Sequence, residues 1–283
     1  SHVARVRFSQ GPTPVGKRDM PESNRLIAFD IDETIVGPDL NVPPALTSVI
    51  SDLRSHGTKF TLATGRILRS ARVFAEMLDI DNEIICYQGA VTAMPSGEIV
   101  RQRTVEMSVI VEALEVLQTS SAQIVSFMDD RIYSTTSTEW SIGYGMRMET
   151  PVELVSDASG LYKVPPNLLL AVDEPDSTDE LASELAERFE KRAMITRSRP
   201  QFCEIGPFGA GKEVALAALA HDMGIDRKDV IAFGDGPGDA EMLKWAGTGV
   251  AVADGHPDAL AAADVVIDGL PGIGVAEYLR QLG

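Results

Sequence analysis

Short apolar runs alternate with amphipathic segments at both ends of this chain. Residues 26–29, 60–63 and 83–86 are short and mainly apolar, as expected of strands that are buried on both faces. Apolar residues recur at helical spacing after the first two runs, over 46–53 and 68–78. The alternation returns after Phe202, with strands predicted at 230–233, 250–252 and 265–267 and helices at 214–219 and 240–245. This order predicts an α/β fold with a doubly wound, Rossmann-like parallel sheet.

The middle of the chain has a different pattern. Strands are predicted there at 123–127, 131–134, 168–172 and 193–196, interspersed with helices at 107–117 and 179–190. A hairpin is predicted over 91–105, around Pro95-Ser96-Gly97. We therefore predict a discontinuous core, residues 22–104 and 202–283, with an inserted α+β cap domain at 105–201. Residues 1–21 are interpreted as a flexible leader in which Ser1-His2 is the remnant of a tag.

Composition excludes several classes of function. The chain has 283 residues, with 42 Asp and Glu against 25 Lys and Arg, a net charge of −17. A generic nucleic-acid binder needs the opposite excess, and an anionic membrane surface would repel this chain. The sequence contains no apolar run of membrane-spanning length and no secretory signal in its first twenty residues. Cys86 and Cys203 lie in apolar runs and are predicted to be reduced core residues, which favours the cytoplasm.

Four polar segments are each expected to follow a strand. The first holds Asp30 and Asp32, two carboxylates that could converge as nucleophile or metal ligand and as general acid and base. An acidic helix-capping loop is the alternative. The second holds Thr64 and Gly65, where a hydroxyl and free amides at the start of a helix would bind an anion. There, an ordinary N-cap is the alternative for Thr64.

The third segment ends in Lys212, and the fourth carries Asp235 and Asp239 on a glycine-rich turn. Lys212 could neutralise a phosphate, although a lone lysine at the start of a helix is often merely solvated. The segment is not a P-loop, because Glu213 stands where that motif needs a hydroxyl. The two aspartates offer the hard oxygen ligands that Mg²⁺ prefers, or else simply cap a turn. If all four segments follow strands of one parallel sheet, they meet at one edge of it.

In this order, the four segments resemble motifs one to four of the haloacid dehalogenase superfamily. An insert between the second and third motifs resembles the C2-capped branch of Cof-type sugar phosphatases. The resemblance implies a Mg²⁺-dependent phosphatase that hydrolyses a small phosphorylated metabolite, with a sugar phosphate as the expected substrate. Asp30 would attack phosphorus and form an aspartyl phosphate, and Asp32 would protonate the leaving oxygen and then activate water. Mg²⁺ would be held by Asp30, the Asp32 carbonyl, Asp235 and Asp239, and the phosphoryl group by Thr64, Gly65 and Lys212.

Three positions depart from the family pattern. Glu33 stands where most members carry Gly, Gln88 where these phosphatases have Asn, and Gly238 where Asn is usual. None of them removes an essential group. The cap should select the substrate, and its candidate cations, together with two on the preceding hairpin, are Arg101, Arg103, Arg131, Arg147, Lys163, Arg197 and Arg199.

Three other functions use some of the same groups as the phosphatase. A receiver-like phosphoacceptor is disfavoured because no Asp follows the third strand and a receiver is far shorter. A sugar-phosphate phosphomutase would use the same motifs and stays open, as does a non-catalytic sugar-phosphate binder. The four histidines lack the spacing of a zinc site. The sequence does not indicate an oligomeric state.

Overall fold

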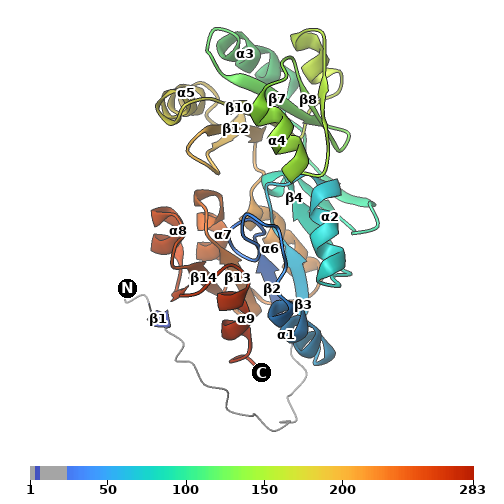
Figure 1. Cartoon of the computed structure of the whole chain (residues 1–283), viewed down its shortest axis with the longest axis vertical. Helices are drawn as coiled ribbons and strands as arrows, with labels where there is room; N and C mark the ends of the chain where they lie inside the picture. Colours follow the sequence, from blue (N-terminus) through green and yellow to red (C-terminus); the bar gives the residue numbers. More distant parts are fainter. Residues whose placement is uncertain (1–3, 7–23) are drawn as a thin grey trace.

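The computed structural model describes residues 4–6 and 24–283, and it has two lobes (Figure 1). The lower lobe is built on a six-stranded sheet in which every pair of neighbours is parallel. Its strands, in spatial order, are β1 (Ala4–Val6), β15 (Val265–Ile267), β14 (Thr248–Val252), β13 (Val230–Gly234), β2 (Leu26–Phe29) and β3 (Lys59–Leu62). The predicted parallel core is therefore confirmed.

Successive residues of β2 face opposite sides of this sheet, as the pleat requires. Ile27 and Phe29 pack in the same cluster as α1 (Pro44–Ser55), α2 (Leu68–Met77) and α9 (Ile273–Leu279). Leu26 and Ala28 pack with α6 (Lys212–Asp222), α7 (Ala240–Trp245) and α8 (Pro257–Ala262). All four side chains of β2 are fully buried. Helices on both faces explain why this strand is a continuous apolar run.

A small antiparallel sheet continues from the edge of the core. Strand β4 (Ile84–Cys86) touches the end of β3 through a bridge between Ala63 and Ile85. It leads through the short helix η1 (Tyr87–Gly89) into the hairpin of β5 (Val91–Ala93) and β6 (Ile99–Gln102). This is the predicted hairpin around Pro95-Ser96-Gly97.

The upper lobe is a second six-stranded sheet. Its order is β11 (Ala193–Thr196), β12 (Phe202–Pro207), β10 (Leu168–Val172), β7 (Gln123–Met128), β8 (Arg131–Ser134) and β9 (Val152–Leu154). Helices α3 (Met107–Leu117) and α5 (Pro175–Arg188) cover one face. Helix α4 (Glu139–Arg147) packs Trp140 and Tyr144 against the other face, the one toward the core lobe (Figure 1). This α+β lobe is the inserted cap. The remaining short helices are η2 (Ala158–Tyr162), η3 (Arg227–Asp229) and η4 (Pro237–Asp239).

The predicted cap boundary at residue 201 needs a correction. Strand β12 pairs antiparallel with β10 and β11, so the cap sheet extends to Pro207. An apolar strand followed by a helix looks like a unit of the core sheet, and only the long-range pairing with β10 reveals its place. The prediction that residues 1–21 form a flexible leader also needs a correction, because Ala4–Val6 forms strand β1 beside β15. The rest of that leader lies outside the described residues.

The turn between β7 and β8 joins the two lobes. Its Asp130 accepts hydrogen bonds from the backbone N–H of Arg69, at 3.0 Å, and from the Tyr87 hydroxyl, at 2.9 Å. Arg69 is in the first turn of α2, whose N-cap residue, Ile67, makes no side-chain capping bond. The cap thus supplies the N-terminal carboxylate that α2 lacks.

Two smaller predictions can be checked. Cys86 and Cys203 are both buried and unpaired, as predicted. Among residues 4–6 and 24–283, no helix has the length and apolar content needed to cross a membrane.

Candidate active site

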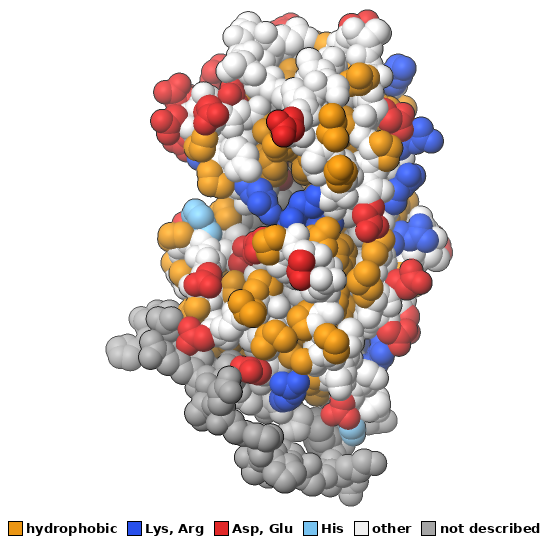
Figure 2. Space-filling view, in the orientation of Figure 1, with side chains coloured by type: hydrophobic (Ala, Val, Ile, Leu, Met, Phe, Trp, Pro, Cys, Tyr) orange, Lys and Arg blue, Asp and Glu red, His pale blue; other side chains and the backbone are white. Residues whose placement is uncertain are grey.

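A cavity of about 520 Å³ lies between the two lobes. Figure 2 shows Lys and Arg side chains gathered in the hollow at this level. Every residue proposed for the site from the sequence lines the cavity, namely Asp30, Asp32, Thr64, Gly65, Lys212, Asp235 and Asp239. The structure therefore brings all seven together at the carboxyl edge of the core sheet, where such folds bind ligands.

Lys212 connects two of the carboxylates. Its Nζ donates to Asp30 Oδ1 and to Asp239 Oδ1, both at 2.7 Å, and all three side chains are at most 9% exposed. Burial alone would lower the pKa of Lys212, but the charges of Asp239 and Asp30 raise it above its ordinary value, so the ammonium stays charged. Burial also raises the pKa of Asp30, against the influence of Lys212. The single positive charge of Lys212 therefore does not neutralise the negative charge of the carboxylates around it.

Asp235 and Asp239 have different tasks in the glycine-rich turn after β13. Asp239 Oδ2 accepts from the backbone N–H groups of Gly236, at 2.9 Å, and Asp235, at 3.2 Å, which fixes the turn. Among the described residues, the Asp235 carboxylate accepts a hydrogen bond from one group, the Thr34 hydroxyl, at 2.8 Å to Oδ1. Burial, followed by the charge of Asp239, raises the pKa of Asp235 to about 7. Asp235 thus keeps an oxygen free for a further cation.

Asp30, Asp235 and Asp239 each offer a carboxylate oxygen within 4.8 Å of the others. Three hard oxygen donors at this spacing suit Mg²⁺, which binds one or two carboxylates and completes its shell with water and phosphate oxygens. The raised pKa values of Asp30 and Asp235 show the same need for positive charge. The residues present therefore fit the metal. Because Asp239 is already occupied by Lys212 and two amides, Asp30 and Asp235 are the better donors.

The route by which Lys212 reaches the site differs from the prediction. It does not follow a strand of the core sheet, because β12 belongs to the cap. Lys212 instead opens α6, which contacts η1, where Gly89 has φ of +93°. A Cβ on Gly89 would lie 2.2 Å from the Gly211 carbonyl oxygen. Glycine at position 89 thus allows the close approach that sets the position of Lys212.

Thr64 and Gly65 lie in the loop before α2. Thr64 is buried, and its hydroxyl accepts the N–H of Arg66 at 3.2 Å. The alternative reading of Thr64 as the N-cap of this helix is wrong, because α2 begins at Leu68 with Ile67 as its N-cap. A Cβ on Gly65 would lie 2.7 Å from Gln88 Nε2, so a side chain there would displace the Gln88 amide. Both residues remain available for an anion in the cavity.

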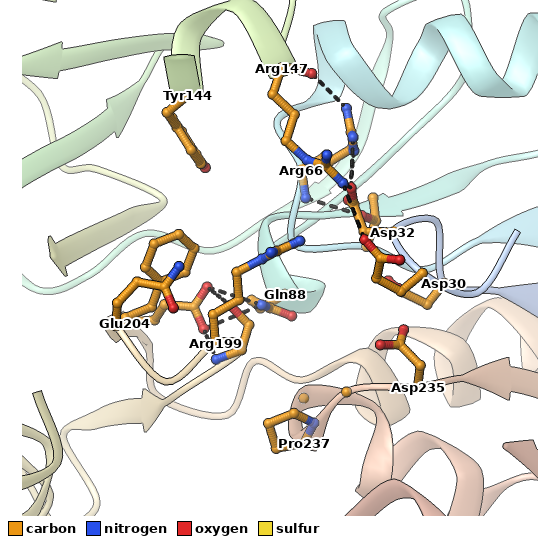
Figure 3. A pocket seen from close by; sticks show the side chains of 18 of the residues that line it. Asp30, Asp32, Arg66, Gln88, Tyr144, Arg147, Arg199, Glu204, Asp235 and Pro237 are labelled. Carbon is orange, nitrogen blue, oxygen red and sulfur yellow. Dashed lines mark hydrogen bonds and ion pairs between the residues drawn. The ribbon is translucent and has the colours of Figure 1, made fainter. Parts of the chain in front are cut away.

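Asp32 is held by two arginines, a pairing that the sequence did not predict. Arg66 Nε and Nη2 donate to its two oxygens, each at 2.8 Å, and Arg147 of the cap also donates to it (Figure 3). Burial raises the pKa of Asp32, but the hydrogen bonds and charges of Arg66 and Arg147 outweigh it and bring the pKa to about 2. Arg66 stands directly after Thr64-Gly65 and could have been suspected. Arg147 was only one of seven candidate cations.

The three departures from the family pattern all lie at this cavity. Glu33 has φ of +59°, and one of its carboxylate oxygens is 3.9 Å from Arg147, so it faces the cap. Gln88 of the core donates to Glu204 of β12 at 3.1 Å, a contact between the lobes. A Cβ on Gly238 would be 3.4 Å from Gln88 Oε1, an ordinary van der Waals contact.

Only two of the candidate cations, Arg147 and Arg199, line the cavity. Three others pair with acids elsewhere: Arg101 with Asp222, Arg131 with Glu153, and Arg197 with Asp179. Arg103 and Lys163 do not line it either. Glu204, Trp140 and Tyr144 also line the cavity and had no sequence signal, because the cap folds around a long-range sheet.

The family model for haloacid dehalogenase-like hydrolases matches residues 27–279, nearly the whole described core and cap. The chain belongs to this family. The HMP-PP phosphatase of Cronobacter sakazakii is 29% identical to this hydrolase over 270 residues, covering 91% of this chain and 95% of the relative. The HMP-PP phosphatase of Enterobacter sp. is 26% identical, over 84% of this chain and 87% of the relative.

Solved structures agree on the fold of this hydrolase. A haloacid dehalogenase-like hydrolase from Bacteroides thetaiotaomicron superimposes with a TM-score of 0.79 at 24% identity, covering 92% of this chain and 99% of that one. The HAD subclass IIB sugar phosphatase BT4131 gives a TM-score of 0.80 at 20% identity, with 92% and 99% covered. The predicted family and fold are thus confirmed. The phosphatases among the relatives also support the predicted enzyme class, a phosphoric monoester hydrolase.

Proposed function

We propose that this hydrolase is a Mg²⁺-dependent phosphatase that cleaves a small phosphorylated metabolite through an aspartyl phosphate on Asp30. The observation that carries the proposal is the bridge from Lys212 Nζ to Asp30 and Asp239, each at 2.7 Å, in the same cavity as Thr64 and Gly65. Phosphoryl transfer needs positioning and charge neutralisation more than covalent chemistry, and these residues supply both.

In this proposal Asp30 is the nucleophile. Lys212 and Mg²⁺ would oppose the effect of burial and keep its carboxylate ionised for attack on phosphorus. Lys212, the Thr64 hydroxyl and the Gly65 N–H hold the phosphoryl oxygens. Asp30, the Asp32 carbonyl and Asp235 would hold Mg²⁺, with Asp239 beside them positioning Lys212. Mg²⁺ would supply the charge that lets an anionic nucleophile approach an anionic phosphate.

Asp32 would serve as general acid and then as general base. With both arginines on its carboxylate, Asp32 is ionised, which is the state that activates water against the aspartyl phosphate. To protonate the leaving oxygen, Asp32 must first exchange part of this contact for the substrate. Because Arg147 belongs to the cap and Arg66 to the core, movement of the cap would release Arg147 alone.

The substrate would be a small phosphorylated molecule. A cavity of about 520 Å³ between two lobes suits a metabolite and excludes bulk water when closed. Sugar phosphates were predicted from the sequence, and the names of the relatives extend the range to HMP-PP. Nucleic acid is disfavoured by the net charge of −17. The cytoplasm remains a prediction from the two unpaired cysteines.

A panel of small phosphomonoesters with Mg²⁺ tests the proposal, with the Asp30→Asn variant run in parallel. We expect the wild type to release phosphate from at least one ester and the variant to lose at least a thousandfold in kcat. Borohydride reduces an aspartyl phosphate, and mass spectrometry should locate the reduced residue at position 30. Equal activity of the variant, or a reduced residue at another position, would contradict the mechanism.

A further inference from the structure

The loop between β11 and β12, residues 197–201, is fixed from both sides. The Arg197 guanidinium donates to Asp179 Oδ1 at 2.5 Å and to the Thr178 hydroxyl at 3.1 Å. The buried carboxylate of Glu204 accepts from the N–H of Ser198 at 3.1 Å and from its hydroxyl at 2.9 Å. The loop therefore holds its shape without a ligand, and whatever it presents to the cavity is preorganised.

That loop presents Arg199. The side chain is half-buried and extends into the cavity, as Figure 3 shows. Within residues 4–6 and 24–283, its guanidinium makes no hydrogen bond and has no carboxylate at ion-pair distance. Arg199 does act on Tyr144: burial raises the pKa of that phenol, and the charge of Arg199 partly opposes the rise.

The other cations of the cavity are already engaged. Lys212 is held by Asp30 and Asp239, and Arg66 and Arg147 are held by Asp32. In a chain with 17 more acidic than basic side chains, a partly dehydrated arginine that forms no ion pair with any described residue is an unusual arrangement. A guanidinium presents a planar fork that matches a carboxylate or phosphate, so an anion is its complement.

Arg199 lies on the cap, whereas the residues proposed to hold the transferred phosphoryl group lie on the core. A molecule that reaches both would place its leaving portion against the cap. We propose that Arg199 binds a second anionic group on this leaving portion, so that the substrates are phosphoesters carrying a further phosphate or carboxylate. The inference rests on the proposed function and adds the substrate class. Trp140, Tyr144 and Phe202 line the same part of the cavity and would strengthen the contact by excluding water.

Two matched pairs of ligands test it: fructose 1,6-bisphosphate against fructose 6-phosphate, and 3-phosphoglycerate against glycerol 3-phosphate. Binding is measured by calorimetry with Mg²⁺ on the Asp30→Asn protein, which would not turn the ligands over. We expect the second anion to tighten binding at least tenfold in one pair. Adding Arg199→Gln should reduce that ratio below threefold, and Arg199→Lys should restore part of it because the charge is kept.

Arg131→Gln is the matched control, since Arg131 is an exposed cap arginine that pairs with Glu153 outside the cavity. It should leave the ratio unchanged. Equal binding within both pairs, or a ratio that Arg199→Gln does not alter, would overturn the inference. Phosphate release from the same four compounds by the wild type is measured separately. If none is released, the proposed function fails for these esters, while the binding ratio still decides the role of Arg199.

Discussion

Arg66 donates two parallel hydrogen bonds of 2.8 Å to Asp32, one to each carboxylate oxygen. The guanidinium is itself fixed, because it donates to the Ser70 hydroxyl at 2.8 Å and lies over the Phe74 ring at 4.8 Å. With its side chain only 2% exposed, Arg66 has little freedom. The position of the proposed acid–base residue is therefore set by the first turns of α2.

The first prediction concerns this fork. Arg66→Lys keeps the charge but replaces two parallel hydrogen bonds by a point contact, so Asp32 should lose its orientation. We expect kcat to fall at least tenfold, with a smaller change in KM, in steady-state assays on the best ester of the panel. Arg72→Lys, on the exposed side of the same helix, is the control and should match the wild type. A fall in kcat in both variants would indicate that the substitutions disturb α2 as a whole, and not specifically the orientation of Asp32.

The second prediction is a pH dependence of stability. The pKa of Asp32 is about 2 in the folded protein, below its ordinary 3.8. A depressed pKa stabilises the fold above the unfolded value, near pH 4, and this contribution is lost as pH falls toward 2. By linkage it amounts to about 2 kcal/mol. Urea unfolding of the wild type and Asp32→Asn should give a difference that shrinks by about 1.5 kcal/mol between pH 5 and pH 2.5, with the remainder lost below pH 2.

Asp30 and Asp235 have raised pKa values and act in the opposite direction, and both proteins retain them. Asp32→Asn removes only the smallest of the causes that raise the pKa of Asp30, so most of their effect cancels in that difference. A difference that stays constant over the same pH range would show that the two arginines do not stabilise ionised Asp32.

The third prediction compares two glycines with positive φ. Gly89→Ala would place a Cβ 2.2 Å from the Gly211 carbonyl oxygen, whereas Gly224, with φ of +66°, has open space around the same position. Gly224→Ala should cost only the backbone strain, about 1 kcal/mol. Gly89→Ala should cost at least twice as much in urea unfolding, and it should also lower kcat by displacing Lys212. Equal losses of stability would show that the contact at Gly89 relaxes freely.

The fourth prediction concerns Mg²⁺. A ligand that binds the folded state alone raises its stability by mass action, about 2.7 kcal/mol at one hundred times the dissociation constant. Thermal unfolding of the wild type should shift upward with Mg²⁺, and EDTA should abolish both the shift and the phosphatase activity. Asp235→Asn removes a free donor and should shrink the shift. An undiminished shift in Asp235→Asn would place the metal elsewhere.

The sequence predicted the parallel core well because local signals dominate there. Strand β2 is buried on both faces and reads as an unbroken apolar run, and the acids after it stand at the sheet edge by necessity. Strand β12 reads the same way, yet it pairs in the cap, since its partner β10 is chosen by long-range packing. The same reason explains why Glu204 and Tyr144 had no sequence signal and why Arg147 was only one candidate among seven, since all three reach the cavity only once the cap sheet has formed.

Asp130 gives the two lobes a shared element. Its carboxylate caps α2 across the lobe boundary, and the residues from Thr64 to Arg69 form one short stretch of chain. Any movement of the cap that carries Asp130 away would leave the N–H of Arg69, in the first turn of α2, without its acceptor. The rate of deuterium exchange at the Arg69 amide would then report the fraction of time that the cap is separated from the core.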